Sequence, residues 1–201
     1  MAYPVSHSGA ANSTSLIHDH TGKLMLHTQV ALLDQLLEHY AAQLGADRAA
    51  YRNHCYRVLN CAASFAQDSS PETLDKLAIA IAFHDLGIWT DHTFDYLAPS
   101  EQRARDYLAE TGRADWAEEV GAMVREHHKL RRYTGNALVE AMRKADWCDV
   151  SLGLLSFGLP RGYRRELSTA FPNAGFHWRL VQLSLRRLLS HPLSPLPMLR
   201  Y

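Results

Sequence analysis

Residues 80–90 read AIAFHDLGIWT, and this stretch decides how the core of the chain is organised. Its first part is apolar, as in a helix that is buried on every side. His84 and Asp85 stand at its end, and Gly87 follows, a residue at which a helix can stop. A buried imidazole and carboxylate need a partner that compensates their polarity. We therefore expect a polar site inside the core at this point.

The composition limits the class of protein. The chain has 201 residues, which fits one domain, with 21 basic and 21 acidic side chains. This balance gives no strong field, so we expect neither a large nucleic acid nor a membrane as partner. The first twenty residues are polar and unlike a signal peptide, and no apolar run could span a bilayer. The three cysteines, Cys55, Cys61 and Cys148, form no close pair, which favours a reduced, cytoplasmic protein.

The hydrophobic pattern indicates an all-α fold, a single compact helical bundle without a strand series or a repeat. Residues 1–20 are expected to form a flexible N-terminal arm, residues 21–190 the domain and residues 191–201 a Pro-rich, extended tail. Ser69 and Glu72 have capping-box spacing before a helix, and residues 88–99 are expected to be a loop. The expected helices cover residues 23–44, 47–62, 71–86, 100–112, 115–128, 136–150, 163–170 and 174–190.

Histidine and aspartate side chains recur on these helices or at their ends. Imidazole and carboxylate are ligands that suit Mn, Fe, Co, Ni and Zn. Structural alternatives exist for each residue: His54 could bond a backbone carbonyl in the core, Asp146 could pair with Arg57 or Arg143, and Asp149 could cap a helix or form a pair. The candidates are His54, His84, Asp85, His127, His128, Asp146 and Asp149.

The order H…HD…HH…D resembles that of the HD-domain superfamily of metal-dependent phosphohydrolases. The similarity lies in HCYRV at 54–58, AIAFHDLG at 80–87, REHHK at 125–129 and RKADWCDV at 143–150. It implies a helical domain that binds one or two divalent ions of Mn, Fe, Co, Ni or Zn. By the resemblance, His54, His84, Asp85 and Asp146 are core ligands, and His127 and His128 match the histidines that hold a second ion.

The resemblance also implies a hydrolase that uses a metal-activated water to cleave a phosphomonoester or phosphodiester of a small molecule, with a nucleotide as one candidate. Ile88 occupies the position where the family often has a Lys or Glu, so proton transfer must involve another residue. The catalytic candidates are Asp85, Glu101, His128 and Lys129. The substrate-binding candidates, which are basic or aromatic, are Trp89, Tyr96, Arg131, Lys144 and Trp147.

Three other functions stay open at this point. His127 and His128 are compatible with a di-iron oxygenase, as some relatives are. The aromatic loop at 89–96 would suit hydration of a small nitrile at a zinc site. Ile88 in place of the usual Lys or Glu is compatible with a non-catalytic, metal-binding module. Nothing in the sequence decides between a monomer and a homodimer.

Overall fold

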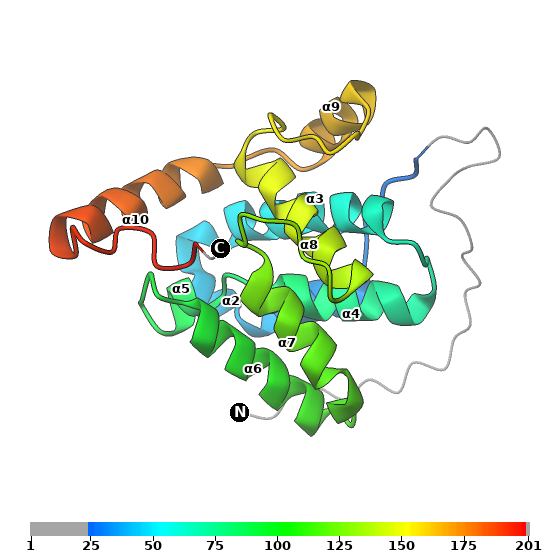
Figure 1. The fold of residues 1–201 in the computed structure, drawn as a ribbon, viewed down its shortest axis with the longest axis horizontal. Helices are drawn as coiled ribbons and strands as arrows, with labels where there is room; N and C mark the ends of the chain where they lie inside the picture. Colours follow the sequence, from blue (N-terminus) through cyan, green and yellow to red (C-terminus); the bar gives the residue numbers. More distant parts are fainter. Residues whose placement is uncertain (1–23, 200–201) are drawn as a thin grey trace.

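A computed structural model describes residues 24–199, and within this range the chain is helical, with no strand (Figure 1). The all-α prediction is confirmed. None of the described helices is long and apolar enough to cross a bilayer. The elements are α1 (Ala31–His39), α2 (Ala41–Leu44), η1 (Gly45–Asp47), α3 (Arg48–Phe65), α4 (Pro71–Phe83), α5 (Gly87–Thr90), α6 (Leu97–Glu110), η2 (Ala114–Trp116), α7 (Ala117–Glu126), α8 (Ala137–Val150), α9 (Arg161–Ala170) and α10 (Phe176–Ser190).

The long helices α3 and α8 pack against each other at the centre of the molecule. They can approach closely because small side chains such as Ala62 and Ala145 are fully buried. Helices α4, α6 and α7 pack together on one side of this pair, α9 lies on the other, and α10 extends away from the bundle (Figure 1). This arrangement brings the ends of α4 and α7 towards the middle of α3 and α8.

The segment before α1 differs from the expected helix over residues 23–44. Its backbone is extended from about residue 25 to Val30, and α1 begins at Ala31. Polar side chains of α3 hold it in this form: Asn60 accepts from the backbone N–H of His27 at 2.7 Å and donates to its carbonyl at 3.1 Å. The hydroxyl of Tyr56 accepts from the N–H of Val30 at 3.0 Å. These tertiary hydrogen bonds replace those that a helix would supply.

Three smaller expectations were wrong. The N-cap of α4 is Ser70, not Ser69, because Pro71 occupies the first helical position and the Ser70 hydroxyl accepts from the N–H of Thr73 at 3.2 Å. The expected loop at 88–99 contains α5 and the beginning of α6. Residues 191–199 of the tail are not extended, since they form turns closed by i→i+3 hydrogen bonds at 191–194 and 196–199. The predicted arm at 1–20 lies outside the described residues.

Gly87 is where the chain passes from the His84–Asp85 turn into α5, and it lies against the beginning of α6. A Cβ at this position would lie 2.9 Å from the carbonyl oxygen of Tyr96 and 3.0 Å from the hydroxyl of Ser100. The Ser100 hydroxyl also accepts from the N–H of Gly87 at 2.9 Å. The close approach of these two backbones therefore requires a glycine.

We predict that Gly87→Ala lowers the free energy of unfolding by about 1–3 kcal/mol, because the new methyl group overpacks this contact. Gly162→Ala is the matched control, since a Cβ there has no neighbour within 4 Å. It should leave stability unchanged or raise it by up to ~1 kcal/mol. Urea denaturation measures both variants, and equal stability of Gly87→Ala and wild type would contradict the prediction.

Candidate metal centre

Four helices bring the predicted ligands together at the centre of the bundle. His54 lies on α3, His84 and Asp85 follow the end of α4, and Asp146 lies on α8. His127 and His128 follow the end of α7, and all six side chains are buried. Three overlapping groups of ligand atoms each lie within 4.8 Å of one another: His54–His84–Asp146, His84–Asp85–His127 and His127–His128–Asp146.

Hydrogen bonds at Nδ1 fix the tautomers of His54 and His84. Nδ1 of His54 lies 2.7 Å from a carboxylate oxygen of Asp149, and Nδ1 of His84 lies 2.7 Å from the carbonyl of Ile81. Both partners are acceptors, so each Nδ1 carries the proton and each neutral ring has a lone pair on Nε2. The two Nε2 atoms lie 2.9 Å apart. Two facing lone pairs repel, unless a cation lies where both can bind it.

His127 repeats the local geometry of His84. Each residue is the C-cap of its helix, where the last carbonyls lack an intrahelical donor, and its Nδ1–H fills that gap. For His127 the acceptor is the carbonyl of Val124, at 2.7 Å. Within residues 24–199, neither its Nε2 atom nor Oδ1 of Asp85 has a hydrogen-bond partner. The helix ends thus aim both rings into the core with their lone pairs free.

The separations suit divalent ions with ligands at about 2.1 Å, for which neighbouring donor atoms lie about 3 Å apart. Nε2 of His84 lies 3.4 Å from Oδ2 of Asp85 and 3.7 Å from Oδ1 of Asp146. A second set uses the other carboxylate oxygens. Oδ1 of Asp85 lies 3.4 Å from Nε2 of His127, and Oδ2 of Asp146 lies 3.2 Å from Nδ1 of His128. Asp85 and Asp146 could therefore bridge two ions.

Asp146 is the buried carboxylate most in need of a cation. Neither of its oxygens has a hydrogen-bond partner among the described residues, and burial raises its pKa well above the ordinary range. The arginines considered as alternative partners are used elsewhere: Arg57 pairs with Asp149, and Arg143 pairs with Glu140. Burying a carboxylate without compensation is costly, so the structure favours a positive ion beside Asp146.

The geometry agrees with the comparison of the sequence with known families. The family model described as HD domain matches residues 51–153, which includes every candidate ligand. The chain belongs to the HD domain family. Members of this family are commonly metal-dependent hydrolases, and the buried His and Asp cluster is compatible with a divalent ion. Neither the curated proteins nor the solved structures that were compared gave a match.

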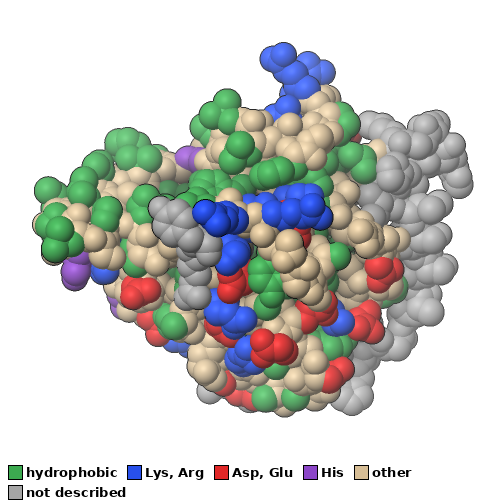
Figure 2. Space-filling model, in the orientation of Figure 1, with side chains coloured by type: hydrophobic (Ala, Val, Ile, Leu, Met, Phe, Trp, Pro, Cys, Tyr) green, Lys and Arg blue, Asp and Glu red, His purple; other side chains and the backbone are tan. Residues whose placement is uncertain are grey.

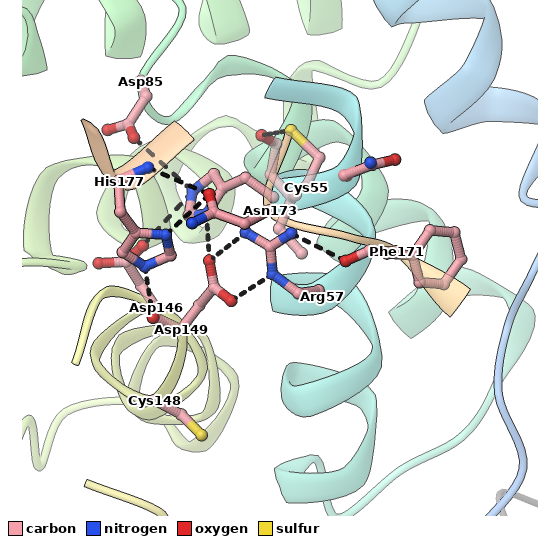
Figure 3. A network of polar contacts seen from close by, with 12 residues as sticks. Cys55, Arg57, Asp85, Asp146, Cys148, Asp149, Phe171, Asn173 and His177 are labelled. Atoms are coloured by element: carbon pink, nitrogen blue, oxygen red, sulfur yellow. Dashed lines mark hydrogen bonds and ion pairs between the residues drawn. The ribbon is translucent and has the colours of Figure 1, made fainter. Parts of the chain in front are cut away.

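Behind the ligands of this HD domain, Arg57 and Asp149 form a second layer of polar contacts (Figure 3). Asp149 receives hydrogen bonds from Arg57 at 2.5 and 2.9 Å in addition to the one from His54, and Arg57 also reaches the carbonyl of Phe171 at 3.0 Å. Burial alone would raise the pKa of Asp149, but the bonds from His54 and Arg57 hold it well below its usual range. Asp149 therefore stays ionised, which confirms that it forms a pair.

His128 differs from the other three histidines. Its Nε2 lies 2.7 Å from the hydroxyl of Tyr96, and burial raises the pKa of that phenol, so Tyr96 is protonated. With an ion at Nδ1 of His128, the ring proton would be on Nε2 and donated to the Tyr96 oxygen. Trp147 packs edge-on to His128, with ring centroids 6.2 Å apart. The side chain of His128 is 11% exposed, the largest value among the six candidates. The cluster is therefore most exposed on the side of His128.

The remaining predicted residues make contacts of their own outside the ligand cluster. Glu101 is held in ion pairs by Arg105 and Arg125. Lys129 follows His128 directly, and its carbonyl accepts from Trp147 at 3.2 Å, whereas the exposed Arg131 lies further along the α7–α8 loop. Lys144 lies over the ring of Phe65 at the far end of α3, and Trp89 donates to Asp47 and packs on Tyr51.

One neighbour of the centre was missed by the sequence analysis. Phe176, the first residue of α10, stacks on His54 with ring centroids 3.9 Å apart. It is far from His54 in the sequence and lies outside residues 51–153, which the family model matches. Since the sequence around it carries no motif, only the tertiary structure reveals the contact.

We predict that Asp149→Asn weakens metal binding about 10–100-fold, because His54 loses the charged acceptor that orients its ring. The matched control is Glu140→Gln, which alters the other buried arginine–carboxylate pair of α8 and contacts no candidate ligand. Equilibrium dialysis with Zn²⁺ and Mn²⁺ measures both variants. Wild-type affinity in Asp149→Asn, or an equal loss in the control, would contradict the prediction.

Burial lowers the pKa of His84 to about 3, from an ordinary value of 6.5. In protein stripped of metal, we therefore predict that the NMR signals of His84 report a neutral ring down to about pH 3, while in urea they titrate near 6.5. The unfolded chain takes up this proton first, so the contribution of His84 to stability is complete above pH 6.5 and is lost as the pH falls towards 3. A folded-state midpoint near the unfolded one would refute this.

Proposed function

We propose that this HD domain is a metal-dependent phosphohydrolase, which cleaves a phosphomonoester or phosphodiester of a small molecule, with a nucleotide as one candidate. The observation that carries the proposal is the pair of Nε2 lone pairs of His54 and His84, 2.9 Å apart, beside the unpartnered oxygens of Asp146. A divalent ion compensates all of these groups at once. The family, commonly one of metal-dependent hydrolases, supports the class of reaction.

A divalent ion held by these residues would supply a coordinated water with a pKa of about 7 and would polarise a phosphoryl oxygen. The protein holds the ligands rigidly for this task. His54 is fixed by Asp149, and His84 and His127 are fixed by carbonyls of their own helices. Rings that are anchored at Nδ1 in this way need no reorganisation during the reaction.

The α7–α8 loop supplies positive charge on the more exposed side of the centre. It carries Lys129, Arg131 and Arg132 directly after His128, and Lys and Arg side chains gather over this region in Figure 2. Arg143 and Trp147 both donate to the carbonyl of Lys129 at 3.2 Å, which fixes the beginning of the loop. These cations would stabilise the charge that develops on a phosphoryl group.

The Tyr96–His128 pair is our candidate for proton transfer. The phenol oxygen lies 2.7 Å from Nε2 of His128, and Nδ1 of the same ring lies 3.2 Å from Asp146. An imidazole between a hydroxyl and the ligand cluster can pass a proton to a leaving group. Ile88, which replaces the Lys or Glu of many relatives, cannot do so. Glu101 is a weaker candidate, since Arg105 and Arg125 neutralise it.

We predict that Asp85→Asn lowers both bound metal and phosphoester turnover by about 100-fold or more, because Asp85 provides an oxygen to each ligand set. The matched control is Asp91→Asn, which changes the same group in an ion pair with Arg103 at the surface. Metal content is measured by elemental analysis, and turnover with aryl phosphate mono- and diesters and nucleoside monophosphates. A metal-loaded wild-type protein that hydrolyses none of them would refute the function.

A di-iron oxygenase is the second candidate function. The observation that favours it is the second set of ligands, His127 and His128, which shares Asp85 and Asp146 with the first. Two equivalents of iron in the purified protein, together with oxygen consumption, would support this reaction over hydrolysis. One equivalent of a redox-inactive metal would exclude it.

A further inference from the structure

A cavity of about 390 Å³ lies behind the candidate metal centre, bordered by α3, the end of α8, the loop that follows it and α9. Asp149 forms part of its wall. Because Asp149 binds Nδ1 of His54, and the ligand atom of His54 is Nε2, the imidazole ring separates the cavity from the metal ligands. The cavity is therefore a different place from the site of the proposed reaction.

The cavity has an excess of positive charge. Arg57, Arg161, Arg164 and Arg165 line it, and Asp149 is the one acid among the described residues of its wall. Arg57 contacts both carboxylate oxygens of Asp149, at 2.5 and 2.9 Å, so the charges of this pair cancel. The three arginines of α9 remain uncompensated within the wall.

The arginines of α9 also lack acidic partners outside the wall. Between residues 24 and 199, no ion pair with a carboxylate includes any of the three. Glu166, the one acid of α9, does not line the cavity. Figure 2 shows Lys and Arg side chains standing out at the top of the molecule, where Figure 1 places α9.

Arg164 is held in position by neutral groups. Its guanidinium donates to the carbonyl of Gly153 at 2.8 Å and to that of Leu159 at 3.3 Å, which leaves its charge intact. Gly153 has a φ of +80°, and a Cβ there would lie 2.4 Å from Nη1 of Arg164. The absence of a Cβ at Gly153 thus leaves space for the guanidinium at the cavity wall, where its charge can attract an anion.

The rest of the wall suits an organic molecule that carries the anion. Ser168 and Asn173 offer polar groups, and Leu152, Leu167 and Phe171 offer apolar surface. The volume is within the range of small-molecule sites, about 300–1,000 Å³. Guanidinium groups match the geometry of phosphate oxygens, and several of them together favour phosphate over a carboxylate.

We propose that this cavity binds a small organic phosphate, with the phosphoryl group held by Arg161, Arg164 and Arg165 and the organic part against the apolar wall. The site is spatially separate from the metal centre, because the His54 ring lies between them. Its occupation would act on the centre through Arg57 and Asp149, which link the cavity wall to His54.

Titration calorimetry of the purified, metal-loaded protein with adenosine 5′-monophosphate and with inorganic phosphate tests the proposal. Arg161→Gln/Arg165→Gln removes two exposed charges of the wall and should weaken nucleotide binding about tenfold or more. Arg186→Gln/Arg187→Gln is the matched control: it removes the same charge from α10, outside this cavity, and should bind as wild type does. Gly153→Ala, which displaces Arg164 without changing the charge, should weaken binding as well.

Each contrary result would overturn the proposal. Wild-type affinity in Arg161→Gln/Arg165→Gln would show that any bound phosphate lies at the metal centre instead. A loss confined to the α10 variant would place the anion beside that helix. Inorganic phosphate that binds as tightly as the nucleotide would exclude a contribution from the organic part. Failure of wild type to bind either probe would remove the site, whatever reaction the metal centre performs.

Discussion

The structure depends on one constraint: the uncharged imidazoles of His54 and His84 must be held inside an apolar core with their Nε2 atoms towards each other. His54 and His84 present Nε2 lone pairs to each other at 2.9 Å, and burial prevents water from separating them. A proton on one ring would relieve the repulsion, but burial lowers the pKa of both histidines. A metal ion relieves it without that cost. The spacing of the ligand atoms supplied by α3, by the end of α4 and by α8 is compatible with such an ion.

Helix ends provide the precision of the centre. His84 and His127 each close a helix, and each uses the carbonyl three residues earlier to set the plane of its ring. At both helix ends, this hydrogen bond to a carbonyl of the same helix orients the ring without a residue from elsewhere in the chain. His54 lies in the middle of α3, where the carbonyls are already bonded, so its ring takes a side-chain acceptor from another helix, Asp149. The position in the helix thus determines which kind of anchor each ligand uses.

The sequence predicts what is local and periodic. The all-α fold, most of the helices and the family follow from apolar spacing and from the four motifs around His54, His84, His128 and Asp146. What depends on tertiary contacts is not predictable in the same way. The segment before α1 has a helical pattern, yet Asn60 and Tyr56 hold it extended. The contact of Phe176 with His54 and the arginine-lined cavity arise from chain segments that carry no motif.

The burial of the ligands has a kinetic consequence. His54, His84, His127 and Asp146 have no exposed surface, so an ion held by them would exchange through local opening of the surrounding helices. Exchange is then limited by the rate of local opening, not by the affinity for competing ions. Where opening is slow, a preparation would keep for some time the ion that it bound first, and dialysis against another ion would replace it gradually.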